Sequence, residues 1–233
     1  MDYLPILLGI SRSTGNSRKE KSGARKSGSS VFSISKDLKT KILERDHYKC
    51  RCCGFASKKY QEVHCIDGNL NESNLSTICI FCHQCFNLDQ VSIMRSGVLL
   101  WLPEISQSDL HHMARAIYVA RISQGPIAEA ARRALDALMK RREAVRSRIG
   151  TDDPYILSTV FKDYLSDNHY MSRSSKIEGI RLFPLDRRII KEADLEFNQF
   201  PQILAYWRSK DGPFGSRTPQ KWFEIYHQIQ SAA

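Results

Sequence analysis

The hydrophobic pattern of the chain changes its period at Pro103. Upstream, short apolar runs at residues 60–66 and 98–102 are typical of strands, and the second run is stopped by the proline. A helix is predicted at residues 36–46, where Ser35 can cap the first turn. Downstream, apolar residues recur every three or four positions, which predicts amphipathic helices. The chain therefore reads as an α+β protein that becomes mainly helical after Pro103.

Cap residues and prolines mark where the later helices begin. A serine, glycine, aspartate or threonine directly before a proline or an apolar stripe is the usual start signal. The predicted helices open at Ser106 or Ser108, at Pro126, at Pro154 and at Pro219, and a weaker one covers residues 187–196. The helix from Pro154 is expected to run to about Ser166.

Three regions follow from this pattern. Residues 1–33 form a flexible basic tail, because residues 11–30 are mostly Ser, Gly, Arg and Lys and offer almost no apolar surface to bury. The apolar residues 4–10 inside it are either a docking segment or an unstructured terminus. Residues 34–104 form a compact cysteine-rich module, and residues 105–233 form the helical region.

Composition agrees with a soluble globular protein that has an acidic partner. The 233 residues are 42% hydrophobic and 26% charged, with a net charge of +10, which suits nucleic acid, anionic lipid or an acidic protein surface. No run approaches the roughly 18 consecutive apolar residues of a membrane span, and the N-terminus lacks the basic start of a secretory signal. A cytoplasmic location is expected.

The cysteines are the candidate metal ligands of this chain. Cys50 and Cys53 form one C-x2-C pair, and Cys79 and Cys82 form another. Two such pairs supply the four thiolates of a closed tetrahedral site, which predicts one structural Zn²⁺ per chain. The seven cysteines leave three outside this set, and Cys52 and Cys85 stand close enough to the pairs to be rival ligands. We treat these two as spare residues.

Between the two pairs stand a predicted strand with His64 and Cys65 and then Asn74-Leu75, and His83 follows Cys82 directly. Residues 38–87 thereby resemble the HNH nuclease treble clef. That resemblance implies a second, catalytic metal held by His64 and His83, with Asn74 orienting the site. The position that should carry the water-activating histidine is Cys65 here, and a thiol with a pKa of about 8.5 beside a metal ligates it more readily than it transfers protons. The HNH site is therefore expected to be vestigial. There are two alternatives. His64 and His83 are packing residues, or the protein is an active metal-dependent nuclease.

A longer succession of motifs is similar to the IcmJ/DotN family of type IVB secretion systems and related conjugation machines. The similarity covers about residues 38–110. It includes Asp46, the stretch from Tyr48 to Cys50, the stretch at Asn74-Leu75-Ser76, and the run from Leu100 through Pro103 to Gln107. The resemblance implies an HNH-like fold with a four-cysteine zinc. It also implies a non-enzymatic subunit of the coupling complex, bound to the C-terminal tail of the DotL-like coupling ATPase.

A basic stretch at residues 132–148 completes the sequence analysis. It holds seven Arg and Lys side chains against Asp136 and Glu143. Such a stretch is a solvated helix face, a surface for the acidic tail of the coupling ATPase, or a DNA-binding surface. The histidine pair His111-His112 cannot share one metal, because neighbours on a helix point about 100° apart. Both side chains are expected to be at the surface or partly buried.

Overall fold

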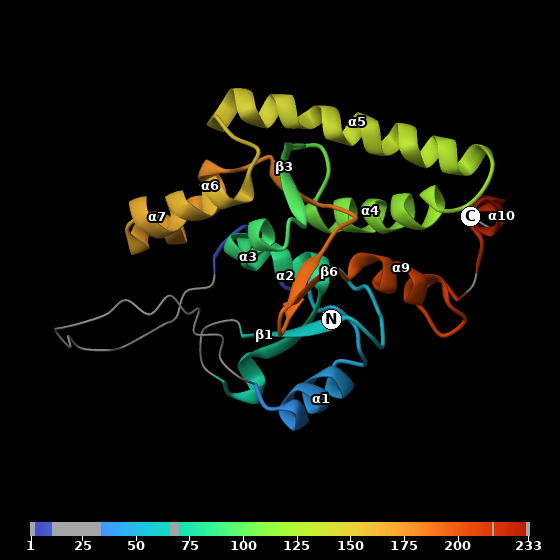
Figure 1. Cartoon of the computed structure of the whole chain (residues 1–233), viewed down its shortest axis with the longest axis horizontal. Helices are drawn as coiled ribbons and strands as arrows, with labels where there is room; N and C mark the ends of the chain where they lie inside the picture. Colours follow the sequence, from blue (N-terminus) through green and yellow to red (C-terminus); the bar gives the residue numbers. More distant parts are fainter. Residues whose placement is uncertain (1–2, 11–33, 66–69, 216, 232–233) are drawn as a thin grey trace.

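The computed structural model describes residues 3–10, 34–65, 70–215 and 217–231 (Figure 1). The basic residues 11–33 lie outside this range. Up to Trp101 the elements are α1 Lys36–Arg45, β1 Gln61–Cys65, a 3-10 turn at Glu72–Asn74, β2 Leu75–Cys79, α2 Ile80–Phe86, α3 Leu88–Ile93 and β3 Gly97–Trp101. Beyond Trp101 they are α4 Gln107–Arg121, α5 Pro126–Ile149, α6 Pro154–Thr159, a π-helical turn at Val160–Tyr164, α7 Asp167–Met171, α8 Arg173–Lys176, β4 Ile180–Pro184, β5 Ile189–Glu192, β6 Leu195–Asn198, α9 Phe200–Arg208 and α10 Pro219–Ser231.

The α+β class and most predicted elements are confirmed. Ser35 caps α1 by accepting a hydrogen bond from the Leu38 amide. The strands expected at residues 60–66 and 98–102 are β1 and β3, within one residue at each end. The long helices α4 and α5 begin where their cap and proline signals placed them, and α10 follows Pro219.

Two strands have no counterpart in the sequence prediction. β2 pairs antiparallel with β1, and β4 pairs antiparallel with β3, with Leu99 opposite Leu182. β2 is buried along its whole length, so its Ser and Thr side chains face protein and the strand shows no polar-apolar alternation. β4 comes about 80 residues after β3, so local sequence gives no sign of the pairing.

The prediction of a helix at residues 187–196 is wrong. These residues form the hairpin of β5 and β6, with Ile189 opposite Asn198 and Glu192 opposite Leu195. Two β-branched isoleucines in succession favour an extended strand, and Ala193 turns the chain with a positive φ of 53° that no helix interior adopts. The expected helix at residues 154–166 is also shorter, because it passes into the π-helical turn after Thr159.

The core is built from both sides of Pro103. α5 runs beside α4 and packs along β3 (Figure 1), and α4 also contacts β4 and α9. Phe81 of α2 meets Phe200 and Trp207 of α9 in an aromatic cluster, with ring centroids 6.5 and 5.6 Å away. The cysteine module and the later helices thus share one hydrophobic core. Among the described residues, no helix is long and apolar enough to cross a membrane.

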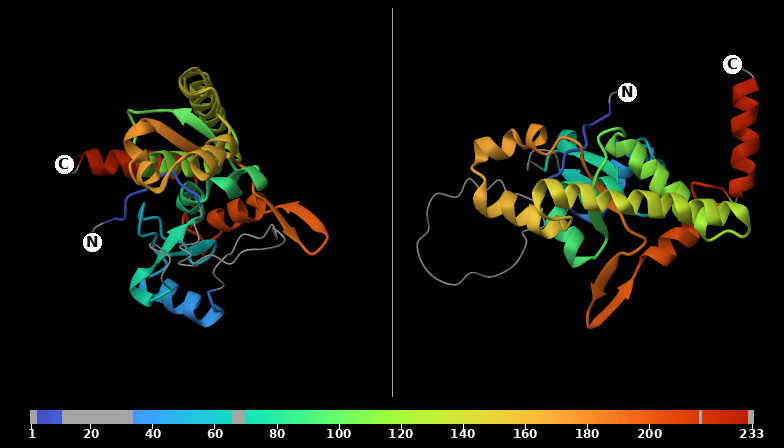
Figure 2. Two further views of the ribbon diagram at one scale, coloured as in Figure 1. Left: turned by 90° about the vertical axis from the view of Figure 1, so that its left-hand side faces the viewer. Right: turned by 90° about the horizontal axis from the view of Figure 1, so that it is seen from above.

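Residues 3–10 pack against the body of the protein. The Leu4 amide donates to the Arg51 carbonyl, the Gly9 amide donates to the Cys85 carbonyl, and the Gly9 carbonyl accepts from the Leu88 amide. Leu8 is buried in the second core cluster. Of the two alternatives for this segment, docking is therefore the correct one. At the other end, α10 projects from the body (Figure 2), and its Trp222 contacts Phe214.

We expect Leu182→Ala to destabilise the whole chain in one transition. Leu182 is fully buried on β4, and the truncation should cost about 2–5 kcal/mol of unfolding free energy through lost contacts and a cavity. Urea unfolding followed by tryptophan fluorescence and by circular dichroism measures this. Leu195→Ala on β6 is the matched control, because Leu195 is 74% exposed and should change little. Two separate transitions in Leu182→Ala would contradict a shared core.

Candidate metal centre

The first cysteine pair lies on a tight turn between α1 and β1. An isolated bridge between Lys49 and Ala56 closes the turn, and the Gly54 amide donates back to the Cys50 carbonyl. Gly54 has a φ of +74°, a conformation that favours glycine, and a Cβ there would meet the Tyr3 hydroxyl at 2.6 Å. The Cys53 amide points at the Cys50 sulfur, 3.5 Å away. The turn thus directs both thiols to one point.

The second pair lies at the start of α2. Cys79 ends β2 and caps α2, and its sulfur accepts from the Cys82 amide at 3.4 Å. β1 and β2 pair from Gln61 opposite Cys79, which brings this helix start beside the first turn. All four sulfurs lie within 4.8 Å of one another and all four residues are buried. The structure therefore brings together the four cysteines predicted as ligands, in a group that could hold a metal ion.

A buried cation lies beside the sulfurs, and its effect on them bears on whether the four cysteines suit a metal ion. Arg115 of α4 is 1% exposed, and its Nη2 donates to the Cys79 sulfur at 2.8 Å. No ion pair found among the described residues joins Arg115 to a carboxylate. Burial opposes the charge on Cys79, but hydrogen bonds from the other three cysteines and the charge of Arg115 hold the pKa of its thiol well below the usual value. Hydrogen bonds among the cysteines instead raise the pKa of the Cys50, Cys53 and Cys82 thiols, so Cys79 is the one of the four that is favoured as a thiolate without a metal. Four sulfurs this close together beside a buried cation fit a soft divalent metal, which thiolates ligate.

His111 corrects the expectation of a surface histidine. It is fully buried, with Nδ1 3.4 Å from the Cys82 sulfur and Nε2 2.9 Å from Nε2 of Gln107. Its burial, which outweighs the influence of Cys79, lowers the pKa of the ring to about 3, so the imidazole is neutral. Its neighbour His112 is exposed, as expected, and its Nε2 lies 2.8 Å from the Cys53 carbonyl oxygen.

The motifs in the sequence do not single out three residues of α4 that the structure places at the cysteine group, namely Gln107, His111 and Arg115. The three are spaced four residues apart and so lie on one face of α4. The signal that could have found them is a polar stripe on a helix whose other stripe is apolar. In the structure that stripe faces the cysteines on one side and β4 on the other.

Three cysteines lie outside the four-sulfur group. Cys52 and Cys85 are buried beside it, and the Cys85 sulfur is 3.7 Å from both the Phe81 carbonyl and Nε2 of His111. Cys65 is half-buried at the end of β1. Within the described residues the metal-ligating group contains only Cys50, Cys53, Cys79 and Cys82.

His64 and His83 face each other, as the HNH resemblance implies. Their ring centroids are 6.3 Å apart, and His64 also stacks on Phe86 at 4.5 Å. Burial, and to a smaller extent His83, lowers the pKa of His64 to about 4. Asn74 ends the 3-10 turn before β2 and is half-buried. No second group of three or more ligating side chains gathers around them in the part of the chain that is described.

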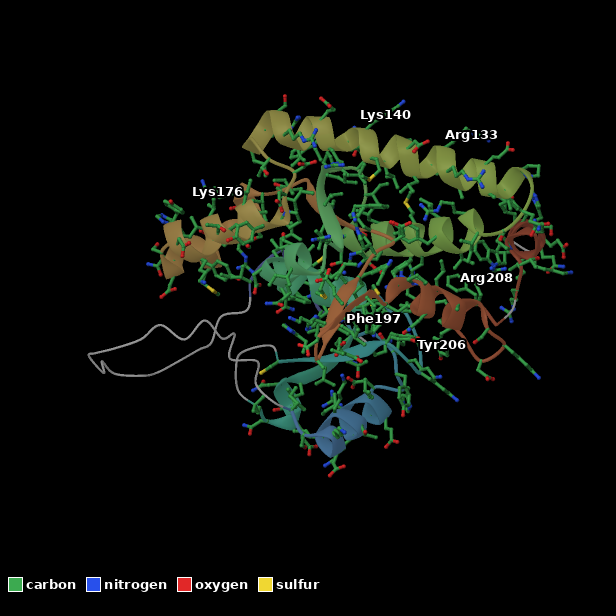
Figure 3. The ribbon with its side chains drawn as sticks, in the orientation of Figure 1. Arg133, Lys140, Lys176, Phe197, Tyr206 and Arg208 are labelled. Carbon is green, nitrogen blue, oxygen red and sulfur yellow. The ribbon has the colours of Figure 1, made fainter. Side chains whose placement is uncertain are left out.

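The basic face of α5 is largely engaged within the molecule. Arg142 and Arg146 both pair with Asp152, Arg141 pairs with Glu104, and the guanidinium of Arg148 lies 4.0 Å from the Trp101 ring centroid. Arg133 and Lys140 project outward from the helix (Figure 3). The internal ion pairs reduce the charge that this helix can offer to a partner.

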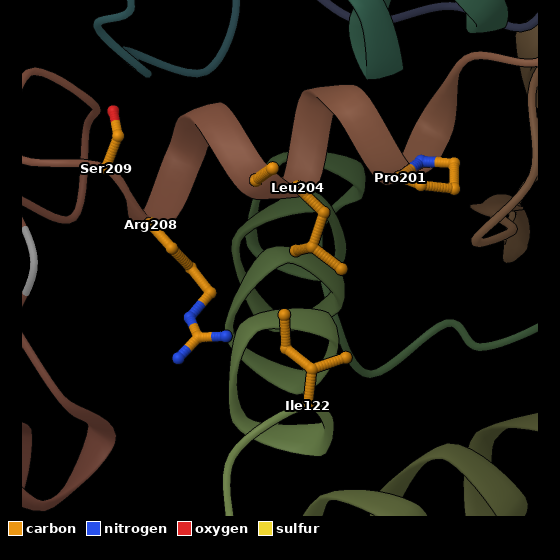
Figure 4. Close-up of a pocket in the computed structure, with 6 residues that line it drawn as sticks. Ile122, Pro201, Leu204, Arg208 and Ser209 are labelled. Carbon is orange, nitrogen blue, oxygen red and sulfur yellow. The ribbon is translucent and has the colours of Figure 1, made fainter.

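A groove opens where the end of α4 meets α9. Its volume is about 430 Å³, and its walls are Ile122, Pro201, Leu204, Ala205, Arg208 and Ser209 (Figure 4). The apolar walls end at the guanidinium of Arg208, which offers a cation to anything that fills the groove.

Taken together, the fold and the site define a mixed helix-and-sheet protein with a buried group of four cysteines that could hold a metal ion. No protein-family model matches the chain. The chain is 30% identical to the Type 4 apparatus protein DotN of Legionella pneumophila subsp. pneumophila over 166 residues, which cover 68% of this chain and 77% of that protein. The chain therefore belongs to the DotN (IcmJ) family, and the expected family is confirmed.

We expect purified protein to carry one metal ion per chain, and Cys79→Ser to lose it. Metal binding is coupled to folding, so the loss should also cost several kcal/mol of unfolding free energy. Elemental analysis and thermal melting measure the two effects. Cys85→Ala is the matched control, because Cys85 is equally buried but lies outside the four-sulfur group. Equal metal content in both variants would contradict the ligand set.

Proposed function

We propose that this protein is a non-enzymatic adaptor of a type IVB coupling complex, in a secretion or related conjugation system. It binds the C-terminal tail of the DotL-like coupling ATPase in the cytoplasm and helps to recruit substrates. The observation that carries the proposal is the similarity to a type 4 apparatus protein over 77% of that protein's length. A subunit of such an apparatus needs a rigid body and a docking surface rather than a reaction.

The metal of this proposal is a structural Zn²⁺. Four thiolates in a buried tetrahedral group are the usual ligand set of structural zinc and leave no open coordination position for water or substrate. The order of elements supports an HNH-like treble clef, since a cysteine turn is followed by the antiparallel pair β1–β2 and by a helix whose first turn carries the second cysteine pair. The zinc would hold these parts together.

Two features support the absence of catalysis. Cys65 stands where the HNH resemblance requires the water-activating histidine, and a thiol is a poor proton-transfer base beside a metal. His64 stacks on Phe86 and is largely desolvated, which suits a packing role. A metal-dependent nuclease remains the second candidate because of the facing pair His64 and His83.

We expect the protein to leave plasmid DNA intact in the presence of Mg²⁺, Mn²⁺ or Ni²⁺, because the base is missing. Gel electrophoresis after prolonged incubation measures cleavage. Two variants make the assay specific: His83→Ala removes the candidate ligand, and His169→Ala changes an exposed histidine on α7. Cleavage by the native protein that disappears only in His83→Ala would show that the protein is a nuclease and contradict the adaptor proposal.

The charge and the groove support a peptide partner. The net charge of +10 attracts an acidic tail, and the apolar groove ending at Arg208 suits an apolar anchor followed by an acidic residue. A DNA-binding zinc module is the alternative partner class. The ion pairs of α5 speak against it, because they occupy several of the cations that phosphates would need.

We expect tail binding to weaken only modestly with salt, because its affinity comes from buried apolar anchors. Binding to a random DNA duplex should instead collapse between about 50 and 300 mM salt, since each phosphate contact contributes about 0.9 to the log-log slope. Fluorescence anisotropy of the labelled tail of the coupling ATPase and of the labelled duplex measures both. Tight duplex binding near 150 mM salt with no tail binding would favour the DNA-binding module.

Ala205→Glu tests the groove within the same titration. The added carboxylate should fill the groove and cancel the attraction of Arg208, so tail affinity should fall at least tenfold. Ala137→Glu places the same change on an exposed position of α5 and is the control. Equal affinity of the two variants for the tail would show that the tail docks on a different surface.

A further inference from the structure

Arg115 is buried in a way that hydrogen bonding does not explain. Its Nη2 donates to Cys79 and lies 3.8 Å from the Cys53 sulfur. Its Nε and Nη1 are buried and have no hydrogen-bond partner among the described residues. A guanidinium has five N–H donors, so a site built for its hydrogen bonds would satisfy more of them. What the site offers Arg115 is an environment for its charge.

The surroundings of Arg115 contain aromatic rings and sulfur. The guanidinium carbon lies 4.0 Å from the Phe55 ring centroid and 4.9 Å from that of Phe81. Aromatic faces attract a cation, but this attraction is weaker than the cost of burying an unpaired ion. The remaining stabilisation of the Arg115 charge has to come from anions. The thiolates of Cys53 and Cys79 are the groups within reach.

The charge of the metal centre matches this need. A divalent ion contributes two positive charges and four thiolates contribute four negative ones, so the loaded centre has a net charge of two minus. Arg115 is part of α4 and contacts a ligand sulfur, so any stabilisation that it gives to the loaded centre is returned to the position of α4. We infer that Arg115 is the counter-charge of the metal centre, and that through it metal binding and the docking of α4 stabilise each other. The inference rests on the metal centre of the proposed function.

The same face of α4 also connects the metal centre to a strand from the later part of the chain. Four residues before Arg115, His111 contacts the Cys82 sulfur, and four residues earlier Gln107 both donates to the Leu182 carbonyl and accepts from the Leu182 amide. These contacts join the cysteine module, α4 and β4 in one chain of interactions. Because the coupling is reciprocal, metal binding should hold α4 more firmly against the module and metal removal should loosen it.

The experiment compares metal affinity in three variants of the full chain. Co²⁺ is the probe, because its absorption identifies a four-thiolate site, and a competing chelator sets the free metal concentration. Arg115→Met keeps the volume and removes the charge, and should weaken Co²⁺ binding by about 10- to 100-fold, as loss of an outer-shell partner does. Arg115→Lys keeps the charge and should lose less. Arg132→Met on the exposed face of α5 should bind as the wild type does.

Thermal unfolding with and without metal separates charge from packing. If Arg115 is a counter-charge, Arg115→Met lowers the Tm of the metal-loaded protein but leaves the Tm of the metal-free protein unchanged or raises it. If Arg115 only fills space, the volume-conserving variant changes both Tm values by the same small amount. Hydrogen exchange in α4 should likewise increase when metal is removed from the wild type, and should change less in Arg115→Met.

The possible failures are distinguishable. Wild-type protein that binds Co²⁺ while Arg115→Met binds it equally well would overturn the counter-charge and leave the metal centre intact. Wild-type protein that does not bind Co²⁺ would overturn the metal centre and this inference together. The adaptor role is judged separately, by binding of the coupling ATPase tail.

Discussion

The structure depends on the confinement of four thiols and one guanidinium in a dry interior. Neither kind of group is stable there alone, because burial penalises an unpaired thiolate and an unpaired guanidinium alike. They meet at the junction of the turn before β1, the start of α2 and the middle of α4, where a divalent ion could complete a compensated cluster. Elements far apart in the sequence are thereby fixed at one point.

That constraint explains why the chain is not a small metal module with an independent helical appendage. β3 finds its partner in β4, and the aromatic cluster of Phe81, Phe200 and Trp207 covers α2 with a helix from near the end of the chain. A short cysteine-rich module buries little apolar surface by itself. Here the later helices supply the missing surface, and residues 3–10 add hydrogen bonds to the Arg51 and Cys85 carbonyls.

The candidate metal centre is buried, whereas the surface carries the features that a partner could reach. The facing histidines His64 and His83 are not part of the four-cysteine group, and among the described residues no further ligating side chains gather around them. The surface instead offers a groove at the meeting of α4 and α9 and the projecting helix α10 (Figure 2). Membership of the DotN family gives these surfaces a context in a type IV secretion apparatus.

The sequence by itself determined the elements with local signals and the four candidate ligands. Caps, prolines and the spacing of the C-x2-C pairs act over a few residues, so α1, α4, α5 and the pairing of cysteines within each turn are readable without a structure. Only the tertiary structure decided what depends on distant partners. β2 and β4 needed their neighbours to be recognised as strands, residues 187–196 became a hairpin, and His111 and Arg115 moved from an ordinary helix face to the metal centre. Burial sets the role of a polar side chain, and burial is a property of the folded chain.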